Sequence, residues 1–261
     1  MPRAHRYFLS GHVWHITHRC HQKEFLLKFA RDRQRWLHWL FEAKKRYGLC
    51  VLDYVVTSNH IHLLVRDTGP DSIPSSLQLI AGRTAQEYNL RKGRKGAYWE
   101  DRYHATAVET DAHLIKCITY IDLNMVRAGV VAHPQAWPQG GYREIQFPPE
   151  RYRIIDLACL IEICGMANIA EFQHQHHQWV EEELRSGHPE RDEGWSKSIA
   201  VGSEPFVRMV QNALGIKAHD RVVMEENDKF VLRESVASYS THNALEMGAL
   251  RVENMLKWDI F

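Results

Sequence analysis

The sequence contains no hydrophobic run long enough to cross a membrane. Its mainly apolar stretches, such as Val51–Val56 and Ile61–Val65, are far shorter than the roughly 18 to 20 apolar residues that a membrane-spanning helix needs. The basic residues at the N-terminus are followed neither by an apolar segment nor by a small-residue cleavage site, so no signal peptide is predicted. We therefore expect a cytoplasmic protein.

The sequence also lacks closely spaced cysteine pairs of the kind that bind metals or form redox motifs. The chain has five cysteines, an odd number, and no two of them form a CxxC pair. Each lies in an apolar or helical stretch, which is typical of reduced side chains in a core. The five are Cys20, Cys50, Cys117, Cys159 and Cys164.

Extremes of composition are missing, but the charge is unevenly distributed. The chain of 261 residues is 44% hydrophobic and 25% charged, which excludes a disordered or fibrous protein and allows one large domain or a domain with a smaller companion. Net charge is only +1, yet residues 1–150 contain 21 Lys and Arg against 14 Asp and Glu (+7), and the remainder contains 12 against 18 (−6). A basic half favours a polyanionic partner, with nucleic acid as the first candidate. The alternative is a chance distribution of surface charge.

The spacing of apolar residues in the first part of the chain predicts strands and helices in the order β-α-β-β-α-β-α. The strands are Val13–Thr17, Leu49–Thr57, Ile61–Arg66 and Tyr103–Val108. The helices are Phe25–Tyr47, Ser75–Leu90 and a third from Asp111 to about Arg127. This order predicts an α+β fold, in which an antiparallel sheet of the ferredoxin-like split βαβ type carries helices on one face.

Proline- and glycine-rich segments at Trp137–Gly141 and Phe147–Pro149 indicate a domain boundary near residue 150, between residues 1–150 and 151–261. The second part is expected to be a mainly helical region that binds DNA or another partner. Its expected helices are Asp156–Cys164, Ile169–Arg185 and Glu204–Leu214, and Ser186–Ser198 is expected to be a loop. The tract His174-Gln175-His176-His177 is interpreted as a solvated helix face, because its spacing does not bring all three histidines together as metal ligands.

Two histidines alternate on one of the predicted strands. His60 and His62 are two residues apart, so their imidazoles point to the same face of the strand and could share one divalent cation. Taken alone, an HxH pair is a weak signal in a chain with 17 histidines. An ordinary structural role for the pair therefore stays open at this point.

A tyrosine and an asparagine share a face of the third predicted helix. Tyr120 and Asn124 are four residues apart, which places their side chains one turn from each other. Singly, such a tyrosine is usually part of a core and such an asparagine lies at a helix end or a surface. If His60 and His62 hold a metal that polarises a phosphate, Asn124 could be a third ligand and Tyr120 a phenolic nucleophile. This combination is the chemistry of DNA strand transfer.

These motifs resemble those of a known family. Ser-Asn-His-Ile-His-Leu-Leu-Val at 58–65 and Tyr-Ile-Asp-Leu-Asn-Met-Val-Arg-Ala-Gly at 120–129 are similar to PNHxHLLV and YIxLNPVRAG of the REP-associated tyrosine transposases, a branch of the single-tyrosine HUH transposases. The resemblance covers most of residues 5–146 and continues more weakly at 202–207 and 230–234. Two paired motifs in the right order are much more specific than either alone.

The resemblance implies an HUH catalytic domain in which His60 and His62 hold a divalent metal, Mg²⁺ or Mn²⁺. It further implies that Tyr120 is the nucleophile and that Asn124 completes the metal site. The implied reaction is cleavage and joining of single-stranded DNA through a 5′-phosphotyrosine, without a nucleotide cofactor. The family's usual substrates are short imperfect palindromes, the REP hairpins, so we expect a nucleoid-associated monomer or homodimer.

The chain departs from the family pattern at Ser58 and Met125, where proline is usual. Neither position carries chemistry. Met125 removes a proline that would stop the helix, so we expect the helix to continue toward Gly129.

Basic side chains near these motifs are candidates for contacts with the DNA backbone. They are Arg91, Lys92, Arg94, Lys95 and Arg102, followed by Arg3, Arg6 and Arg19. The segment 91–95 could instead be a solvated loop, and the aromatic residues Tyr98, Trp99 and Tyr103 could either stack on bases or belong to the core. Two competing functions are a non-catalytic, domesticated DNA hairpin-binding protein and a metal-dependent hydrolase that uses water in place of Tyr120.

Overall fold

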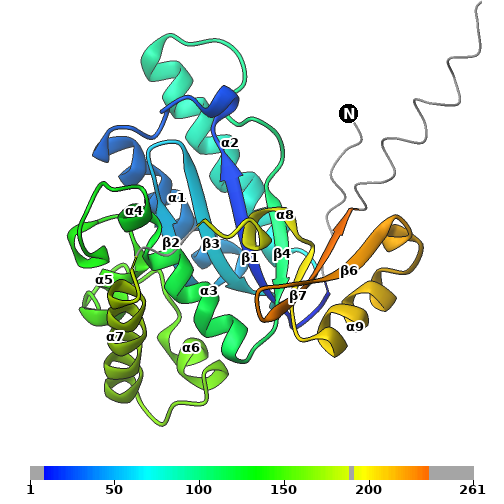
Figure 1. Cartoon of the computed structure of the whole chain (residues 1–261). Helices are drawn as coiled ribbons and strands as arrows, with labels where there is room; N and C mark the ends of the chain where they lie inside the picture. Colours follow the sequence, from blue (N-terminus) through cyan, green and yellow to red (C-terminus); the bar gives the residue numbers. More distant parts are fainter. Residues whose placement is uncertain (1–8, 188–190, 235–261) are drawn as a thin grey trace, which may run out of the picture.

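The computed structural model describes residues 9–187 and 191–234, and it is organised around one seven-stranded sheet (Figure 1). The strands follow one another across the sheet in the order β2-β3-β1-β4-β5-β7-β6. They are β1 (Val13–Arg19), β2 (Cys50–Val56), β3 (His60–Arg66), β4 (His104–Val108), β5 (Ala200–Gly202), β6 (Arg221–Glu226) and β7 (Lys229–Glu234). All neighbouring pairs are antiparallel except β4 and β5. The expected α+β class with an antiparallel sheet is confirmed.

Helices surround this sheet. The α-helices are α1 (Ala30–Tyr47), α2 (Ser72–Lys92), α3 (Ala112–Asp122), α4 (Asn124–Arg127), α5 (Gly141–Gln146), α6 (Leu157–Ile163), α7 (Ile169–Arg185), α8 (Gly194–Lys197) and α9 (Glu204–Leu214). Three short 3₁₀ turns are η1 (His21–Lys23), η2 (Pro134–Ala136) and η3 (Gly215–Ala218). Helix α1 ends at Gly48, whose φ of 65° is the left-handed conformation that glycine adopts without strain. In the described residues, no helix is long and apolar enough to cross a membrane.

The helices cover both faces of the sheet, which corrects the expectation that they lie on one face. Side chains alternate along β1, so Trp14 and His18 point to one face and His15 to the other. His18 stacks on Trp99, whose indole donates to the Ala81 carbonyl of α2, and α1 packs along α2 on this face. Helix α3 packs on the opposite face. The physical reason is that β2 is buried along its whole length, which requires cover on both sides.

The region after residue 150 contains the expected helices α6, α7 and α9, and it also contributes three strands that the sequence did not predict. Ala200 of β5 pairs in parallel with Ala107 of β4, and the hairpin of β6 and β7 then extends the same sheet. Asn227 and Asp228, both with positive φ, form the turn of this hairpin. Strands from both sides of residue 150 therefore share one sheet. The short β5, three residues long, has too little alternation to be recognised from its sequence.

The core lies on both sides of the first four strands. All five cysteines are free, as expected, and Cys20, Cys50 and Cys117 are fully buried in this core. The two others, Cys159 and Cys164, are half-buried. Because the interior of the sheet is rigid, side chains that its central strands present to α3 are held in fixed positions.

Candidate active site

The two histidines of the HxH motif lie at the beginning of β3, on the face of the sheet that α3 covers. Backbone pairing sets His60 opposite Arg19 and His62 opposite Thr17 of β1. The two imidazole ring centroids are 5.1 Å apart and the rings are nearly perpendicular, at 77°. The strand alternation that the sequence predicted thus brings both rings to one place.

The turn between β2 and β3 orients the imidazole of His60. Its Nδ1 lies 2.7 Å from Oδ1 of Asn59 and 3.0 Å from Oγ1 of Thr57. Since an oxygen of an amide group can only accept, Nδ1 carries the proton and donates to Asn59. The other ring nitrogen, Nε2, is then the one with a lone pair for a ligand.

A third histidine, His15, orients the imidazole of His62. Nδ1 of His62 lies 2.8 Å from Nε2 of His15, and the two rings stack at 10° with centroids 5.0 Å apart. Nε2 of His62 faces the side-chain amide of Asn124 at 3.0 Å. His15 did not stand out in the sequence beyond its place in a strand, because only the pairing register between β1 and β3 shows that it lies beside His62.

Tyr120 and Asn124 come to the same face as the two histidines. The Tyr120 ring centroid is 5.9 Å from that of His62 and the rings meet edge to face. The expected single helix is interrupted at Leu123, with a ψ of 3°, so α3 ends at Asp122 and α4 begins at Asn124. The structure therefore gathers the four predicted residues, Tyr120 and Asn124 with the two histidines, around one point.

Arg127 is a further residue of this site. Its guanidinium carbon lies 3.9 Å from the ring centroid of Tyr120, and its Nη2 donates to the Tyr120 carbonyl at 2.6 Å. Its Nη1 is buried without a hydrogen-bond partner in the described residues, and no carboxylate of those residues forms an ion pair with it. A seven-residue spacing on one continuous helix would have suggested that Arg127 lies near Tyr120, but the helix is interrupted at Leu123, so only the structure shows that they meet.

Burial determines the protonation of these groups. Desolvation, reinforced by Arg19 and other nearby arginines, lowers the pKa of His60 to about 4, and burial lowers the pKa of His62 well below its ordinary value. Burial likewise lowers the pKa of His15 to about 3. All three imidazoles are therefore neutral at pH 7, which is the form that binds metals. Burial raises the pKa of Tyr120, and the charge of Arg127 opposes that rise.

A cavity of about 670 Å³ opens beside Tyr120, between α3, α7 and the hairpin of β6 and β7. Residues from beyond position 150, including Arg191, Trp195 and Arg233, line it together with Tyr120 and Arg127. Trp195 of α8 is buried, and its ring centroid is 6.2 Å from that of Tyr120. The region after residue 150 is thus part of the wall of the candidate site.

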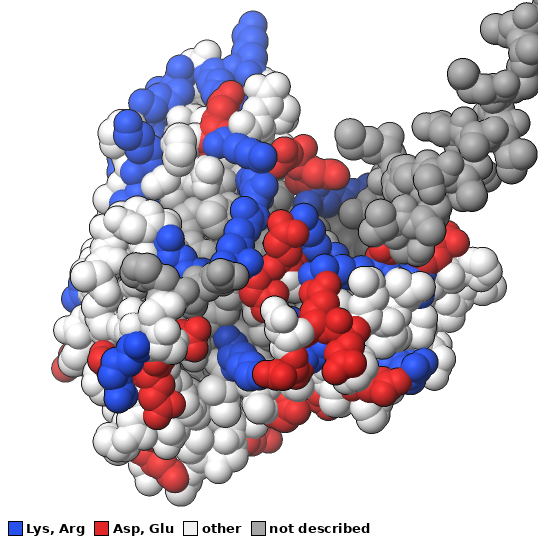
Figure 2. All heavy atoms as spheres, viewed as in Figure 1, with Lys and Arg blue, Asp and Glu red and all other residues white. Residues whose placement is uncertain are grey.

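Some of the cations predicted to contact DNA are paired with carboxylates, and others are not. Figure 2 shows Lys and Arg concentrated over the end of α2 and the loop that follows it, and mixed with Asp and Glu elsewhere on this face. Arg91 pairs with the buried Asp32, and Arg94 pairs with Glu24. Of the other predicted cations, Lys92, Lys95 and Arg102 are exposed, and Arg19 is half-buried opposite His60. Arg3 and Arg6 lie outside the described residues.

The three aromatic residues named with these cations belong largely to the interior. Tyr98 and Tyr103 are buried, and Trp99, half-buried, stacks on His18 at 4.0 Å. Of the two interpretations that the sequence left open, membership of the core is the one that describes them. They hold the loop after α2 against β1.

The histidine tract of α7 is not simply a solvated helix face, as the sequence suggested. His176 is fully buried, with its Nε2 2.7 Å from Oδ2 of Asp122, so it joins α7 to α3. His174 is exposed and contacts Gln178. The difference arises because α7 packs against α3, and this tertiary contact has no signature in the local sequence.

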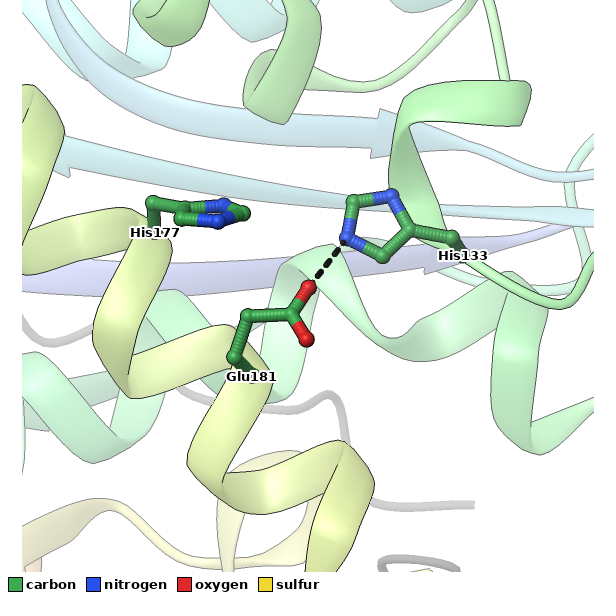
Figure 3. A group of neighbouring side chains, drawn as sticks. All are labelled: His133, His177 and Glu181. Atoms are coloured by element: carbon green, nitrogen blue, oxygen red, sulfur yellow. Dashed lines mark ion pairs between the residues drawn. The ribbon is translucent and has the colours of Figure 1, made fainter.

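His177 of the same tract lies near His133 and Glu181 (Figure 3). The His133 Nδ1 accepts from the backbone N–H of Gln135, and its Nε2 lies 3.2 Å from Oε1 of Glu181, at ion-pair distance. Nδ1 of His177 contacts the hydroxyl of Tyr142 at 2.9 Å.

The fold and the site together define an α+β domain with a histidine pair and a tyrosine on one face of its sheet. Residues 9–124, a little less than half of the chain, match the family model described as IS200-like transposase. The transposase resemblance found in the sequence is thereby confirmed, and with it a transposase-like, DNA-processing function. No significant match was found among curated proteins.

Two solved structures are similar to the chain. The structure of a REP-associated tyrosine transposase bound to a REP hairpin is 21% identical, covers 59% of this chain and 90% of its own, and has a TM-score of 0.48. The crystal structure of a proposed transposase from Deinococcus radiodurans R1 is 15% identical, covers 49% of this chain and 92% of its own, and has a TM-score of 0.31.

Proposed function

We propose that the protein cuts and joins single-stranded DNA through a covalent bond to Tyr120. The observation that carries this proposal is the position of the Tyr120 ring, whose centroid lies 5.9 Å from that of His62, the imidazole that the Asn124 amide also meets at 3.0 Å. A phenol beside a cluster of neutral metal-binding groups suits nucleophilic attack on a phosphate. The transposase family of residues 9–124 supports DNA as the substrate.

The residues present fit a divalent metal ion. His60 and His62 have their Nδ1 atoms engaged by Asn59 and His15, so each presents Nε2, and the Asn124 amide meets Nε2 of His62 at 3.0 Å. We assign Mg²⁺ or Mn²⁺ to this set, with the amide oxygen of Asn124 turned toward the ion. When bound, such an ion offsets negative charge on the non-bridging oxygens of the scissile phosphate.

Tyr120 supplies the nucleophile in the proposed reaction. Its phenolic oxygen forms a bond to phosphorus, the bond to the 3′ oxygen breaks, and the strand leaves with a free 3′-hydroxyl. The remaining strand stays on the protein as a 5′-phosphotyrosine. Because a phenoxide is also a good leaving group, the 3′-hydroxyl of another cut end can reverse the step and join two strands. The energy of the phosphodiester is retained, so no nucleotide cofactor is needed.

Arg127 compensates the negative charge that develops during this step. A half-buried guanidinium without a carboxylate partner is costly, since it loses hydration and gains no ion pair in the described residues. Its place 3.9 Å from the Tyr120 ring centroid suits it to stabilise the phenolic oxygen and an incoming phosphate. The anionic substrate would therefore supply the partner that Arg127 lacks.

Replacing Arg127 with glutamine is expected to slow cleavage by about a hundredfold or more, since removing one such donor from a reacting site has an effect of that order. Arg127→Lys retains the charge but not the planar fork, so its cleavage rate should lie between those of the wild type and the glutamine variant. The measurement is the single-turnover rate at saturating DNA, with thermal melting as the control for folding. A glutamine variant that cleaves at the wild-type rate would exclude this role.

The proposed substrates are single-stranded hairpins of the REP type, bound by a monomer or homodimer. The experiment is to incubate the protein with Mn²⁺ and a hairpin strand labelled at one end or the other, then denature it. We expect a 3′-label to remain attached to protein and a 5′-label to be released on a fragment with a 3′-hydroxyl. Cleavage without an adduct would indicate a hydrolase that uses water, and binding without cleavage would indicate a non-catalytic hairpin-binding protein.

The exposed lysines after α2 are expected to contact the DNA backbone. Each contact with a single strand contributes roughly 0.7 to the slope of log affinity against log salt, so Lys92→Ala with Lys95→Ala should reduce the slope by about 1.4. Binding of hairpin and unrelated strands should weaken by similar factors. A salt series of binding measurements tests this, and an unchanged slope would mean that both lysines are merely solvated.

The matched control for this experiment is Arg91→Ala in the same segment. Arg91 pairs with Asp32, which is 5% exposed, so its removal leaves a buried carboxylate alone. Because a buried acceptor left without its partner costs about 1–3 kcal/mol, we expect a loss of that size in the free energy of unfolding, together with a smaller change in the salt slope than the lysine pair produces. Chemical denaturation measures the first quantity.

A further inference from the structure

Two large apolar side chains are exposed on the loop between η1 and α1. Phe25 is 65% exposed and Phe29 is 57% exposed, whereas Leu26 and Leu27 between them are buried. The loop is therefore anchored in the core, and its two phenyl rings point outward from a fixed backbone. Two exposed aromatic rings on one anchored loop make this loop a candidate binding surface.

Positive charge lies beside one of these rings, that of Phe29. The ammonium nitrogen of Lys92 lies 5.6 Å from the ring centroid of Phe29, and that of Lys28 lies 6.0 Å from it. Within residues 9–187 and 191–234, neither lysine forms an ion pair, and the acidic neighbours Glu24 and Asp32 are each paired with an arginine. The surface therefore combines aromatic faces with uncompensated cations.

The same loop contacts the turn that carries the candidate metal ligand. The backbone N–H of Leu27 donates to the Ser58 carbonyl at 2.9 Å, and the side chain of Asn59 donates to the Lys23 carbonyl at 3.2 Å. Oδ1 of Asn59 in turn accepts from His60 at 2.7 Å. One residue thus links the loop directly to the imidazole of His60.

The 3₁₀ turn η1, which leads into this loop, adopts a costly backbone conformation. Gln22 and Lys23 are consecutive non-glycine residues in the left-handed region, with φ of 50° and 61°. Each such residue costs on the order of 1–3 kcal/mol, which the surrounding contacts must offset. The Asn59 side chain is one of these contacts, because it binds the Lys23 carbonyl.

We infer that Phe25 and Phe29 form a platform on which unpaired bases of the DNA strand beside the scissile phosphate stack, with Lys28 and Lys92 contacting its phosphates. This inference rests on the proposed function, because it names how the same site holds its substrate. Bases of any sequence offer a π face to a phenyl ring, and the flanking lysines match the backbone charge. An apolar protein segment would not require the lysines.

The test compares the affinity of hairpins with and without a single-stranded tail, measured by fluorescence anisotropy. In the wild type the tail should strengthen binding. In the double variant Phe25→Ala, Phe29→Ala this increment should fall by about five- to 150-fold for each stacked base. The matched control is Phe147→Ala, a phenylalanine of similar exposure (61%) after α5, which should retain the full increment.

Two further arms separate base stacking from a general apolar contact. Abasic nucleotides in the tail should remove the gain in affinity that the tail gives to the wild type. In the double variant they should cause no further loss, as expected for a double-mutant cycle of interacting groups. Phe29→Leu, which keeps an apolar side chain, should behave like Phe29→Ala, and Phe29→Tyr should behave like the wild type. Full affinity of Phe29→Leu would overturn the platform in favour of an apolar contact.

The outcomes also distinguish this inference from the proposed function. If the wild type forms a covalent adduct but the double variant keeps the full increment of the tail, only the platform is wrong. If the wild type forms no adduct with any strand and a tail adds nothing to its affinity, both the proposed function and the platform are wrong. Thermal melting of each variant confirms that the exposed replacements leave the fold intact.

Discussion

Tyr120→Phe is expected to lower strand cleavage by roughly four orders of magnitude or more while leaving hairpin binding nearly unchanged. The substitution deletes the oxygen that would attack phosphorus, and loss of a nucleophile has effects of this size. The phenyl ring remains, so its contacts with Trp195 and the Arg127 guanidinium persist. Binding and chemistry should therefore separate in this one variant.

The measurement combines a gel-shift assay with denaturing electrophoresis of the covalent adduct. Tyr103→Phe is the matched control, because it removes the same oxygen from a buried tyrosine whose neighbour His18 belongs to the opposite face of the sheet. We expect this control to form the adduct. If Tyr120→Phe still yields a denaturation-resistant adduct, Tyr120 is not the nucleophile and Tyr103 becomes the next candidate.

Replacing either histidine of the HxH motif is expected to weaken Mn²⁺ binding by about a hundredfold or more and to stop cleavage, because so sparse a site cannot lose a ligand and still place the phosphate. His62→Ala should have the larger effect of the two. It also leaves His15 and Asn124 without their 2.8 Å and 3.0 Å partners. Isothermal titration with Mn²⁺ measures the affinity directly, independently of DNA.

Graded variants make this experiment sharper. Asn124→Ala should reduce activity rather than remove it, since water can occupy an open coordination position. His15→Ala should lower the affinity for Mn²⁺ by about ten- to a hundredfold, as expected for a group that orients a ligand. His38→Ala, an exposed histidine on α1, is the control and should bind like the wild type. Equal Mn²⁺ affinity in the wild type, His60→Ala and His62→Ala would exclude the metal assignment.

The sequence by itself determined the parts of this protein that depend on local periodicity. The two-residue repeat of a strand places His60 and His62 on one face, and the four-residue spacing of a helix does the same for Tyr120 and Asn124. The first relation holds in any fold that keeps the strand, and the second pair still meets at the site although the helix is interrupted at Leu123. The order of elements likewise sufficed for the α+β class and the antiparallel sheet, and the two motifs sufficed for the transposase family.

Only the tertiary structure decided which distant groups complete the site. His15 reaches His62 through the register of β1 against β3, and Trp195 reaches Tyr120 because β5 joins the sheet next to β4. Arg91, a predicted DNA contact, also pairs with Asp32, 59 residues away. Such contacts depend on how elements pack across long stretches of chain, and this packing is set by the burial of whole faces. No local pattern records it, so the partners of each side chain appear only in the folded molecule.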